Sequence, residues 1–323
     1  MSGGFDNGFS LSPLAGGGFG SKVLLVVEGG AYATIQDAID ASADNDVILV
    51  GPKAAGASWG PMAFASNKRL VVASLGSKWS AQVKVDSVTF NVLAPGVGQT
   101  ILNSTVFVRG LLIESSFTAT GGVNFSGASP GRLRLQECVV FNTNAAGGTG
   151  VVSNNSGSGS SLYIDNCIIQ SGFSTGIGVD HQQGYTNIRG DSAVSRYQYP
   201  LQCTAGEVEI LNALLDGTGI ANEVVRIIGG TVTCGYTTIR NTTTNASGVN
   251  LTAAGATFLM GDATFFIATG TGYCVNGPAS ATPTAVYLYG SVAYTNSLAA
   301  AFNVKVKNTI SAIAITQAFT PSA

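Results

Sequence analysis

The residues whose types best suit catalysis lie near the middle of this chain, around its single histidine. Asp180 and His181 are adjacent, and Arg189 and Asp191 follow a short distance along the chain. If the fold gathers these side chains at one corner, they form a carboxylate–arginine site with a histidine, a combination suited to acid–base chemistry. Ordinary ion pairing in a surface loop accounts for the same residues, and the sequence favours that interpretation. The four residues are therefore candidates, and no catalytic residue is assigned.

Metal and cofactor sites are not indicated by the sequence. The five cysteines have no Cys-x-x-Cys spacing, and a single histidine does not complete a zinc cluster. An odd number of widely spread cysteines also argues against a disulfide framework. The chain has no phosphate-binding loop and no dinucleotide fingerprint. We therefore expect no metal, no cofactor and free thiols.

The charge pattern argues against two classes of partner. The formal net charge is −2 at pH 7, and the basic residues are scattered, so they form no stripe that could follow a phosphate backbone. The chain contains no run of 18 apolar residues, which a membrane-spanning helix would need. We expect neither nucleic-acid binding nor membrane insertion.

A ten-residue pattern that occurs eight times indicates which fold must position these residues. Its first and third positions are apolar, its fifth is usually Gly, Asn, Asp or Glu, and its eighth is apolar again. The units start 22 to 29 residues apart, and such a period is typical of a solenoid in which each unit is one coil. The units are Val106–Ser115, Leu133–Asn142, Leu162–Ser171, Thr186–Ser195, Val208–Gly217, Val232–Asn241, Phe258–Ile267 and Val286–Thr295.

Each unit predicts two inward-facing strands joined by a bend. The first and third side chains lie on one face of a strand, and the fifth residue is of a type that tolerates the positive φ of a sharp bend. The apolar eighth position, which is Ala193 in the fourth unit, belongs to the second strand. The sixth position holds Cys138 and Cys167 in neighbouring units, so these thiols are expected to stack as small apolar residues.

A weaker signal precedes most units and supplies a third strand per coil. It consists of a glycine followed by alternating residues, and it begins at Gly122, Gly150, Gly176, Gly248 and Gly272. Three short strands per coil, stacked in parallel, predict an all-β fold, a right-handed single-stranded parallel β-helix. A β-sandwich with coincidental spacing is the alternative, and the repeat favours the β-helix.

The ends of the chain differ from the repeat. Residues 1–22 are Gly-rich and aperiodic and lack the basic and apolar regions of a signal peptide, so we predict a flexible arm. Residues 23–297 are predicted to form the β-helix with its cap, whose helix spans about 34–43 after Thr34 as N-cap. Residues 298–323 break the repeat and are predicted to cap the open end or contact another subunit.

The capping segment carries a family signature. Residues 32–42, YATIQDAIDAS, precede a strand ending in DVILVGP at residues 46–52. This arrangement resembles the capping helix and first strand of the pectin-lyase-like superfamily, in which pectin methylesterases, pectate-lyase-type proteins and many phage virion β-helices open this way. The order of a short N-terminal arm, a helical plug, a polar-faced solenoid and a different C-terminal segment resembles most of all the virion β-helix proteins of tailed bacteriophages. The resemblance covers about 30–55 by motif and 106–295 by repeat. It implies the fold more than an activity, because the superfamily includes enzymes and non-enzymes.

The catalytic strings of the enzymes in this superfamily are incomplete here. Asp180-His181 is similar to part of the Trp-x-Asp-His-Cys string of pectate lyases, but the Trp and the Cys are missing. The Arg-x-Pro-x-x-Arg string that carries their catalytic arginine is absent from the sequence. The resemblance therefore favours a non-enzymatic role and leaves an enzymatic one open.

The resemblance implies a structural protein of a bacteriophage virion, either a capsid decoration or part of a tail fibre or spike. Such a protein is made in the host cytoplasm, attaches through its termini and is exposed on the particle. Its expected partners are other virion proteins, further copies of itself in a homotrimer, and host surface glycans. Two alternatives stay open. One is a polysaccharide-degrading enzyme, pectate-lyase-like or a tailspike depolymerase, and the other is a glycan-binding adhesin that uses Tyr163, Tyr185, Tyr197 and Tyr199.

Overall fold

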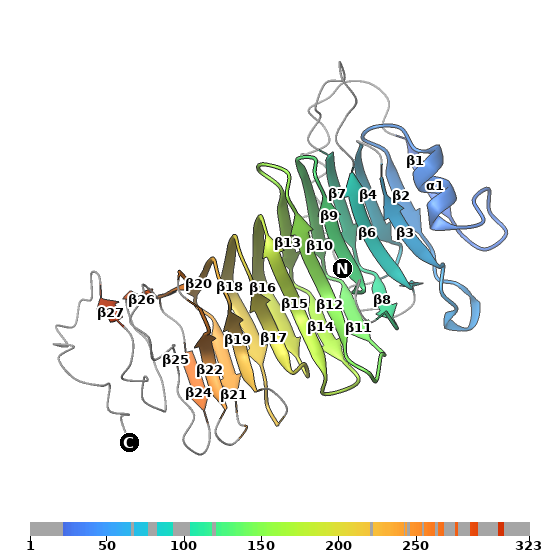
Figure 1. Cartoon of the computed structure of the whole chain (residues 1–323). Coiled ribbons are helices and arrows are strands. Elements are labelled where there is room, and N and C mark those ends of the chain that lie inside the picture. Colours follow the sequence, from blue (N-terminus) through green and yellow to red (C-terminus); the bar gives the residue numbers. More distant parts are fainter. Residues whose placement is uncertain are drawn as a thin grey trace, which may run out of the picture.

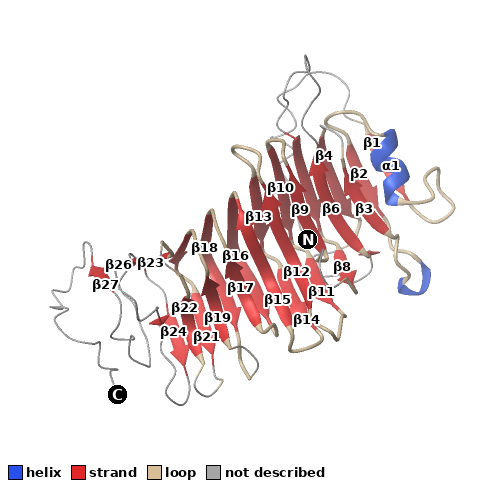
Figure 2. Cartoon of the chain, in the orientation of Figure 1, coloured by secondary structure: helices blue, strands red, loops and turns tan. Residues whose placement is uncertain are grey.

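The computed structural model is a parallel β-solenoid with an α-helix at its N-terminal end (Figures 1 and 2). The structure describes residues 22–65, 68–76, 83–92, 104–117, 121–219, 222–241, 243, 246–253, 255–261, 264–267, 275–276, 285–289 and 303–306. Over this part of the chain the strands pair in parallel. The predicted all-β parallel β-helix is confirmed.

One ladder of strands runs along the whole solenoid, and we call it the first ladder. In order, it contains β1 (Val23–Val26), β2 (Val47–Val50), β4 (Arg69–Ser74), β7 (Ser104–Arg109), β10 (Gly131–Gln136), β13 (Ser161–Asp165), the first half of β16 (Tyr185–Ser195), the first half of β18 (Glu207–Asp216), β20 (Thr231–Gly235), β23 (Thr257–Gly261), β26 (Ala285–Tyr289) and β27 (Asn303–Val306). The first residues of all eight sequence units pair with one another along this ladder, from Val106 to Val286. The repeat therefore predicts the register residue by residue.

The other two sides of each coil form two further ladders. The second contains β5 (Lys84–Val85), β8 (Leu112–Ser115), β11 (Val139–Asn142), β14 (Ile168–Ser171), the second halves of β16 and β18, β21 (Thr238–Asn241) and β24 (Thr264–Ile267). The third is the separate sheet of β3 (Pro61–Phe64), β6 (Ser87–Val92), β9 (Val123–Gly127), β12 (Gly148–Asn155), β15 (Gly176–Gln183), β17 (Tyr199–Cys203), β19 (Glu223–Ile227), β22 (Ser247–Leu251) and β25 (Val275–Asn276). Three inward faces enclose one continuous apolar core.

The bend between the first two ladders adopts positive φ, as the sequence predicts. The fifth residues of the described units are Gly110, Glu137, Asn166, Gly190, Asn212 and Tyr236, with φ between 51° and 71°. Glu137 and Tyr236 are unusual residues for this conformation, which costs a non-glycine residue about 1–2 kcal/mol. The fold therefore imposes the bend even where the residue type does not favour it. The corresponding Asp262 and Gly290 lie outside the described residues.

The unit Thr186–Ser195 departs from the predicted pattern. The pairing between β16 and β18 shifts register between Arg189 and Ser192, which is the signature of a bulge with one extra residue. As a result Val194 pairs with Ile169 and is fully buried, while Ala193 lies on the outward side. The prediction that Ala193 fills the inward eighth position is wrong.

The helix α1 (Ile35–Ala41) closes the N-terminal end of the core. Thr34 is its N-cap, and a capping box with Asp37 satisfies the free backbone N–H groups. Ile35 is buried together with Ala38 and Ile39, and the helix packs against β1, β2 and β3. A 3-10 turn, η1 (Ala54–Gly56), follows β2. The predicted cap is confirmed.

The two chain ends are only partly described. Residues 1–21 of the predicted arm lie outside the described residues. In the predicted C-terminal segment, β27 pairs in parallel with β26, so the first ladder extends one strand beyond the last sequence unit. The remainder of residues 298–323 lies outside the described residues.

A column of buried residues, most of them small, follows the corner between the first two ladders. It consists of Leu111, Cys138, Cys167, Ser192, Ala213 and Thr237. Its polar members donate to carbonyls of the preceding coil: the Cys138 thiol to Val108, and the Thr237 hydroxyl to Ile210. The predicted stacking of Cys138 and Cys167 is confirmed, and both thiols are free. Cys203 and Cys234 are also free and buried, whereas Cys274 lies outside the described residues.

Candidate functional site

The structure does not bring the four candidate residues together. Asp180 and His181 are neighbours on β15, so their side chains point to opposite faces of the third ladder. Arg189 and Asp191 lie on β16, at the corner between the first two ladders. The polar partners of the four are different residues, which the next paragraphs describe.

His181 lies inside the solenoid and is fully buried. Its Nδ1 is 2.9 Å from the Thr186 hydroxyl, which in turn donates to the Ser153 hydroxyl at 2.9 Å. The side chains of His181, Thr186 and Ser153 thus form one buried chain of polar contacts. Burial lowers the pKa of His181 to about 4. A neutral imidazole enclosed in the core is a structural group that solvent does not reach.

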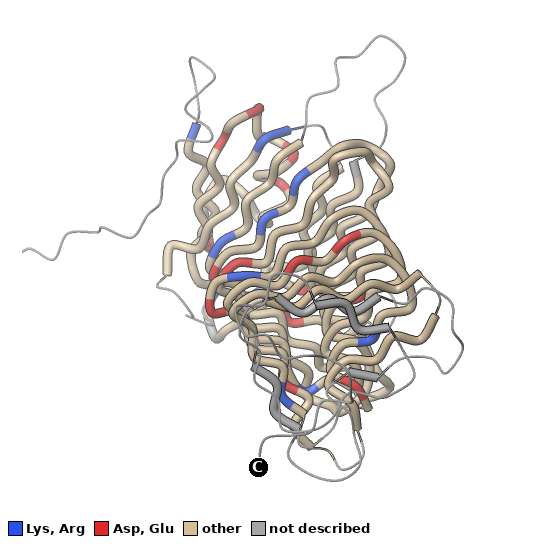
Figure 3. The backbone as a smooth tube through the Cα atoms, turned by 90° about the vertical axis from the view of Figure 1, so that its left-hand side faces the viewer, with Lys and Arg blue, Asp and Glu red and all other residues tan. Residues whose placement is uncertain are grey.

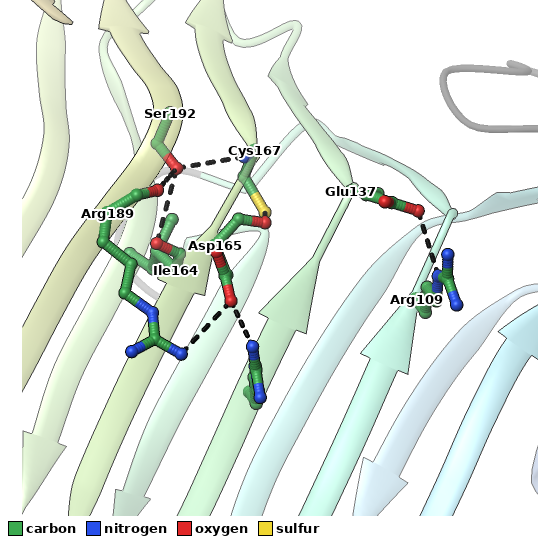
Figure 4. Close-up of polar contacts among 8 residues, drawn as sticks. Arg109, Glu137, Ile164, Asp165, Cys167, Arg189 and Ser192 are labelled. Carbon is green, nitrogen blue, oxygen red and sulfur yellow. Dashed lines mark hydrogen bonds and ion pairs between the residues drawn. The ribbon is translucent and has the colours of Figure 1, made fainter. Parts of the chain in front are cut away.

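The other three candidates make separate polar contacts, and Asp180 is itself a buried residue. Asp180 accepts hydrogen bonds from Gln182 at 2.8 Å and from Gln202 at 3.2 Å. The exposed Asp191 accepts one from Asn212 at 3.2 Å. Arg189 lies 3.3 Å from the Asp165 carboxylate (Figure 4) and is the one candidate that belongs to the groove described below.

Two of the four proposed tyrosine platforms are not available as open surfaces. Tyr197 is fully buried, and burial raises the pKa of its hydroxyl well above the usual range. Tyr199 is covered by the Arg226 guanidinium, 4.9 Å from its ring centroid. The expectation that Tyr197 is a platform is wrong, because the residue follows the second strand of its coil and turns inward. Tyr163 and Tyr185 remain half-buried on the outward face, 6.2 Å apart and nearly edge-to-face.

A groove of about 380 Å³ lies on the outward face of the first ladder. We call it the arginine groove, and its lining residues are Arg69, Thr105, Phe107, Arg132, Arg134, Tyr163 and Arg189. They come from five successive strands, β4, β7, β10, β13 and β16. Figure 3 shows basic positions grouped on neighbouring coils. Alternate residues of a strand point outward, which explains why the lining is polar and aromatic while the residues between are apolar.

The parallel register places six of the seven lining residues in two columns, and Arg189 lies in the next column, where it pairs with Asp165. Phe107 pairs with Arg134, and Arg134 with Tyr163, so that a guanidinium lies between two rings. Thr105 and Arg132 form the neighbouring column together with Arg69. The Arg134 guanidinium is 5.8 Å from the centroid of Phe107. The Arg189 guanidinium is 5.7 Å from that of Tyr163, and both distances allow cation–π attraction.

Two carboxylates hold three of the groove arginines in place. Asp165 pairs with both Arg134 and Arg189, the second of which is labelled in Figure 4, and its side chain is only 11% exposed. Asp44 pairs with Arg69, whose hydrogen bond lowers the pKa of that carboxyl. Arg132, by contrast, is exposed, and its side chain has no ion pair or hydrogen bond with any described residue. The groove therefore presents fixed guanidinium groups and one free one.

An acidic cluster adjoins the groove on the next strands of the same face. The Tyr185 hydroxyl donates to Glu209, which also accepts from Asn187 at 2.6 Å. Burial and Glu209 together raise the pKa of Tyr185 to about 12. Glu207 lies two residues before Glu209 on β18, and the same strand face bears both. The Cα atoms of alternate residues on a strand lie about 7 Å apart, so the two glutamates are near neighbours on this face.

Sequence reasoning missed both the arginine groove and the Glu207–Glu209 pair. The arginines are scattered along the chain, and only the strand register brings them together. The glutamate pair could have been predicted from the sequence Glu207-Val208-Glu209 around the start of the Val208 unit, because alternate residues of a strand lie on the same face.

Comparisons with protein-family models, with curated proteins and with solved structures gave no match. Among the described residues, no group of three or more His, Cys, Asp and Glu side chains is placed to hold a metal ion. The described helices include none that is long and apolar enough to cross a membrane. The geometry of the face itself is therefore what bears on function.

Proposed function

We propose that this chain is a non-enzymatic structural protein of a bacteriophage virion. In this proposal it is a β-helix that decorates the capsid or forms part of a tail fibre or spike, attached through its termini and exposed on the particle. The phage assignment rests on the resemblance of the chain to virion β-helix proteins, in the order of its N-terminal arm, helical plug, polar-faced solenoid and different C-terminal segment. The structural role rests on the observation described next.

The observation that carries the proposal is the use of outward carboxylates to join neighbouring coils. Asp165 bridges Arg134 and Arg189, Glu137 pairs with Arg109 at 2.9 Å, and Glu114 pairs with Lys84 at 2.9 Å. The partners in these pairs come from different coils. Carboxylates that pair with cations of a neighbouring coil hold the outer faces of the two coils together. They are well suited to fixing the outer surface of a rod.

The proposal is tested by imaging particles of the phage that encodes the chain. We expect the chain to occupy regular positions on the capsid or tail. A variant without residues 1–22 should keep the circular dichroism spectrum of the full chain and should show reduced occupancy. Absence of the chain from assembled particles would contradict the proposal, and undiminished occupancy of the truncated variant would contradict attachment through the arm.

The enzymatic alternative is favoured by one observation, the Glu207–Glu209 pair beside the groove. The test is release of reducing ends from acidic and neutral polysaccharides by the purified chain and by the variants Glu207→Gln and Glu209→Gln. The matched control is Asp191→Asn, which removes an exposed acid at the corner instead. Cleavage that is lost in Glu209→Gln and retained in the control would replace the structural proposal with a glycoside hydrolase. No cleavage by any of the proteins would support the structural role.

A further inference from the structure

We infer that the arginine groove binds an acidic glycan that carries about one carboxylate for every two sugar units. The inference deepens the proposed function and rests on it for the exposure of this face to surface glycans. Four observations support this inference: the length of the groove, its net charge, the order of its side chains and the unpaired side chain of Arg132.

The groove is long enough for a short segment of a polymer. Its lining residues come from five adjacent strands, β4 to β16, and thus span four steps of the ladder. Neighbouring strands lie about 4.8 Å apart, so the groove extends for about 19 Å along the solenoid. One step is comparable to the length of one sugar unit in an extended chain. About four units therefore fit side by side with four successive coils.

The net charge of the groove favours a ligand with few charges. Its four arginines and the two carboxylates that pair with them, Asp44 and Asp165, leave a net charge of +2. A glycan with one carboxylate per two sugars places about two negative charges along this length, and these balance the net charge of the groove. Duplex DNA carries one phosphate per about 3.4 Å on each strand, so the same length holds five or six. The groove does not neutralise a nucleic-acid backbone.

The order of side chains suits alternating charged and uncharged sugars. Phe107, Arg134 and Tyr163 occupy one column on three successive strands, so rings and a guanidinium alternate along the axis. An aromatic ring packs against the apolar face of a sugar, and a guanidinium fork matches a carboxylate with two hydrogen bonds. Asp165 fixes the Arg134 fork before the ligand arrives, which reduces the entropy lost on binding.

Arg132 is the groove arginine that has no ion pair with a described residue. It is exposed on β10 and has no charged partner among the described residues. At the other end, Glu209 and Glu207 follow Tyr163 on later strands and repel a further carboxylate. The ligand is therefore confined to the stretch from Arg69 to Arg189.

The experiment measures binding of four probes to the purified full-length chain by calorimetry. A hyaluronan hexasaccharide has one carboxylate per two sugars, and chitohexaose is its uncharged counterpart. An oligothymidylate and an oligoglutamate peptide represent other polyanions. Three variants are compared: Arg132→Ala, Arg132→Lys, and Arg196→Ala as the control. Arg196 is also exposed, but it lies beyond the second strand of its coil and does not line the groove.

We expect hyaluronan to bind and chitohexaose to bind at least tenfold more weakly. Arg132→Ala should weaken hyaluronan binding about tenfold, the loss of one charge-assisted hydrogen bond. Arg132→Lys should restore only part of this loss, since it lacks the fork, and Arg196→Ala should bind like the wild type. Unchanged thermal unfolding of each variant shows that the fold is retained.

Equal binding by Arg132→Ala and wild type would overturn the inference, as would the absence of hyaluronan binding. Equal or tighter binding of oligothymidylate or oligoglutamate would overturn it in favour of a nucleic acid or an acidic protein segment. Each of these results leaves the location of the chain on the particle untouched, because imaging decides that point. Failure of this inference and failure of the proposed function are thus distinguishable.

Discussion

Acidification is expected to destabilise the solenoid through His181, whose imidazole is fully enclosed in the core. Burial lowers its pKa from 6.5 to about 4. Between these values the unfolded chain binds a proton that the folded chain excludes, so the free energy of unfolding falls as the pH falls. The stabilising contribution is complete above about pH 6.5 and is lost as the pH decreases through about 4. The difference between the two pKa values corresponds to about 3 kcal/mol.

The assay is urea unfolding, followed by circular dichroism, at pH values from 4 to 8. The reference variant is His181→Asn, whose amide can still donate to Thr186 but does not titrate. The ion-paired Asp44 and Asp216 have pKa values lowered from 3.8 by their arginine partners, against an opposing effect of burial. Their contribution is therefore lost mainly below this window, and it is shared by both proteins. The difference between the two proteins isolates the histidine.

We expect the free energy of unfolding of the wild type to fall by about 3 kcal/mol relative to His181→Asn between pH 6.5 and 4. Parallel curves for the two proteins would refute the reasoning. A histidine titration observed by NMR near pH 6.5 in the folded state would refute it independently, because it would show that the imidazole is accessible to protons at no cost.

Three further predictions concern the strands and corners. Ser192→Ala should lower the free energy of unfolding by about 1–3 kcal/mol, because the Cys167 N–H loses its acceptor at 3.1 Å. Ser192→Cys should retain most of the stability, because cysteine occupies this corner in the two preceding coils. Equal urea midpoints for the two variants would contradict this role of the Ser192 hydroxyl. Tyr236→Gly should raise the free energy of unfolding by roughly 0.5–1 kcal/mol, because the strain that positive φ imposes on a tyrosine backbone exceeds the entropy cost of a glycine. Tyr236→Ala is the control, since alanine keeps the strain. A lower Tm for the glycine variant than for the wild type would contradict the presence of backbone strain at this position. Ile164→Asp should prevent folding, because it places an unpaired charge in the interior. Ile164→Val should lower the free energy of unfolding by only about 0.5–1.5 kcal/mol. Soluble, folded Ile164→Asp protein would show that solvent reaches this position of the core.

The architecture could be predicted from the sequence because the repeat encodes it locally. Inward positions such as Leu135 and Ile164 recur with the coil and have to be apolar, so the register is legible without a structure. The bulge in the Thr186 unit could not be predicted in the same way. Ala193 and Val194 are both apolar, and either residue satisfies the pattern, so only the pairing with Ile169 and Leu215 decides between them.

The candidate site was less predictable, because outward residues are free of the constraint that the core imposes. Arg69 and Arg132 are 63 residues apart, yet they belong to strands separated by only one other. Asp180 and His181 were candidates because an acidic residue and the single histidine are adjacent in the sequence. The alternation of a strand separates their side chains, and the histidine serves the core. A surface site on a solenoid is formed by residues from successive coils, which are far apart in the sequence, so sequence spacing alone does not reveal it.

The parallel ladder also sets how the length of this protein can change. Leu162 on β13 pairs with Leu133 before it and with Thr186 after it, and the corner column continues through all three coils. Removing residues 162–185 would therefore bring β10 against β16 in the same register and shorten the rod by about 4.8 Å. Duplicating the same segment would lengthen it by the same step. A gene for such a chain can adjust the reach of its product one coil at a time while both ends, and whatever they hold, stay the same.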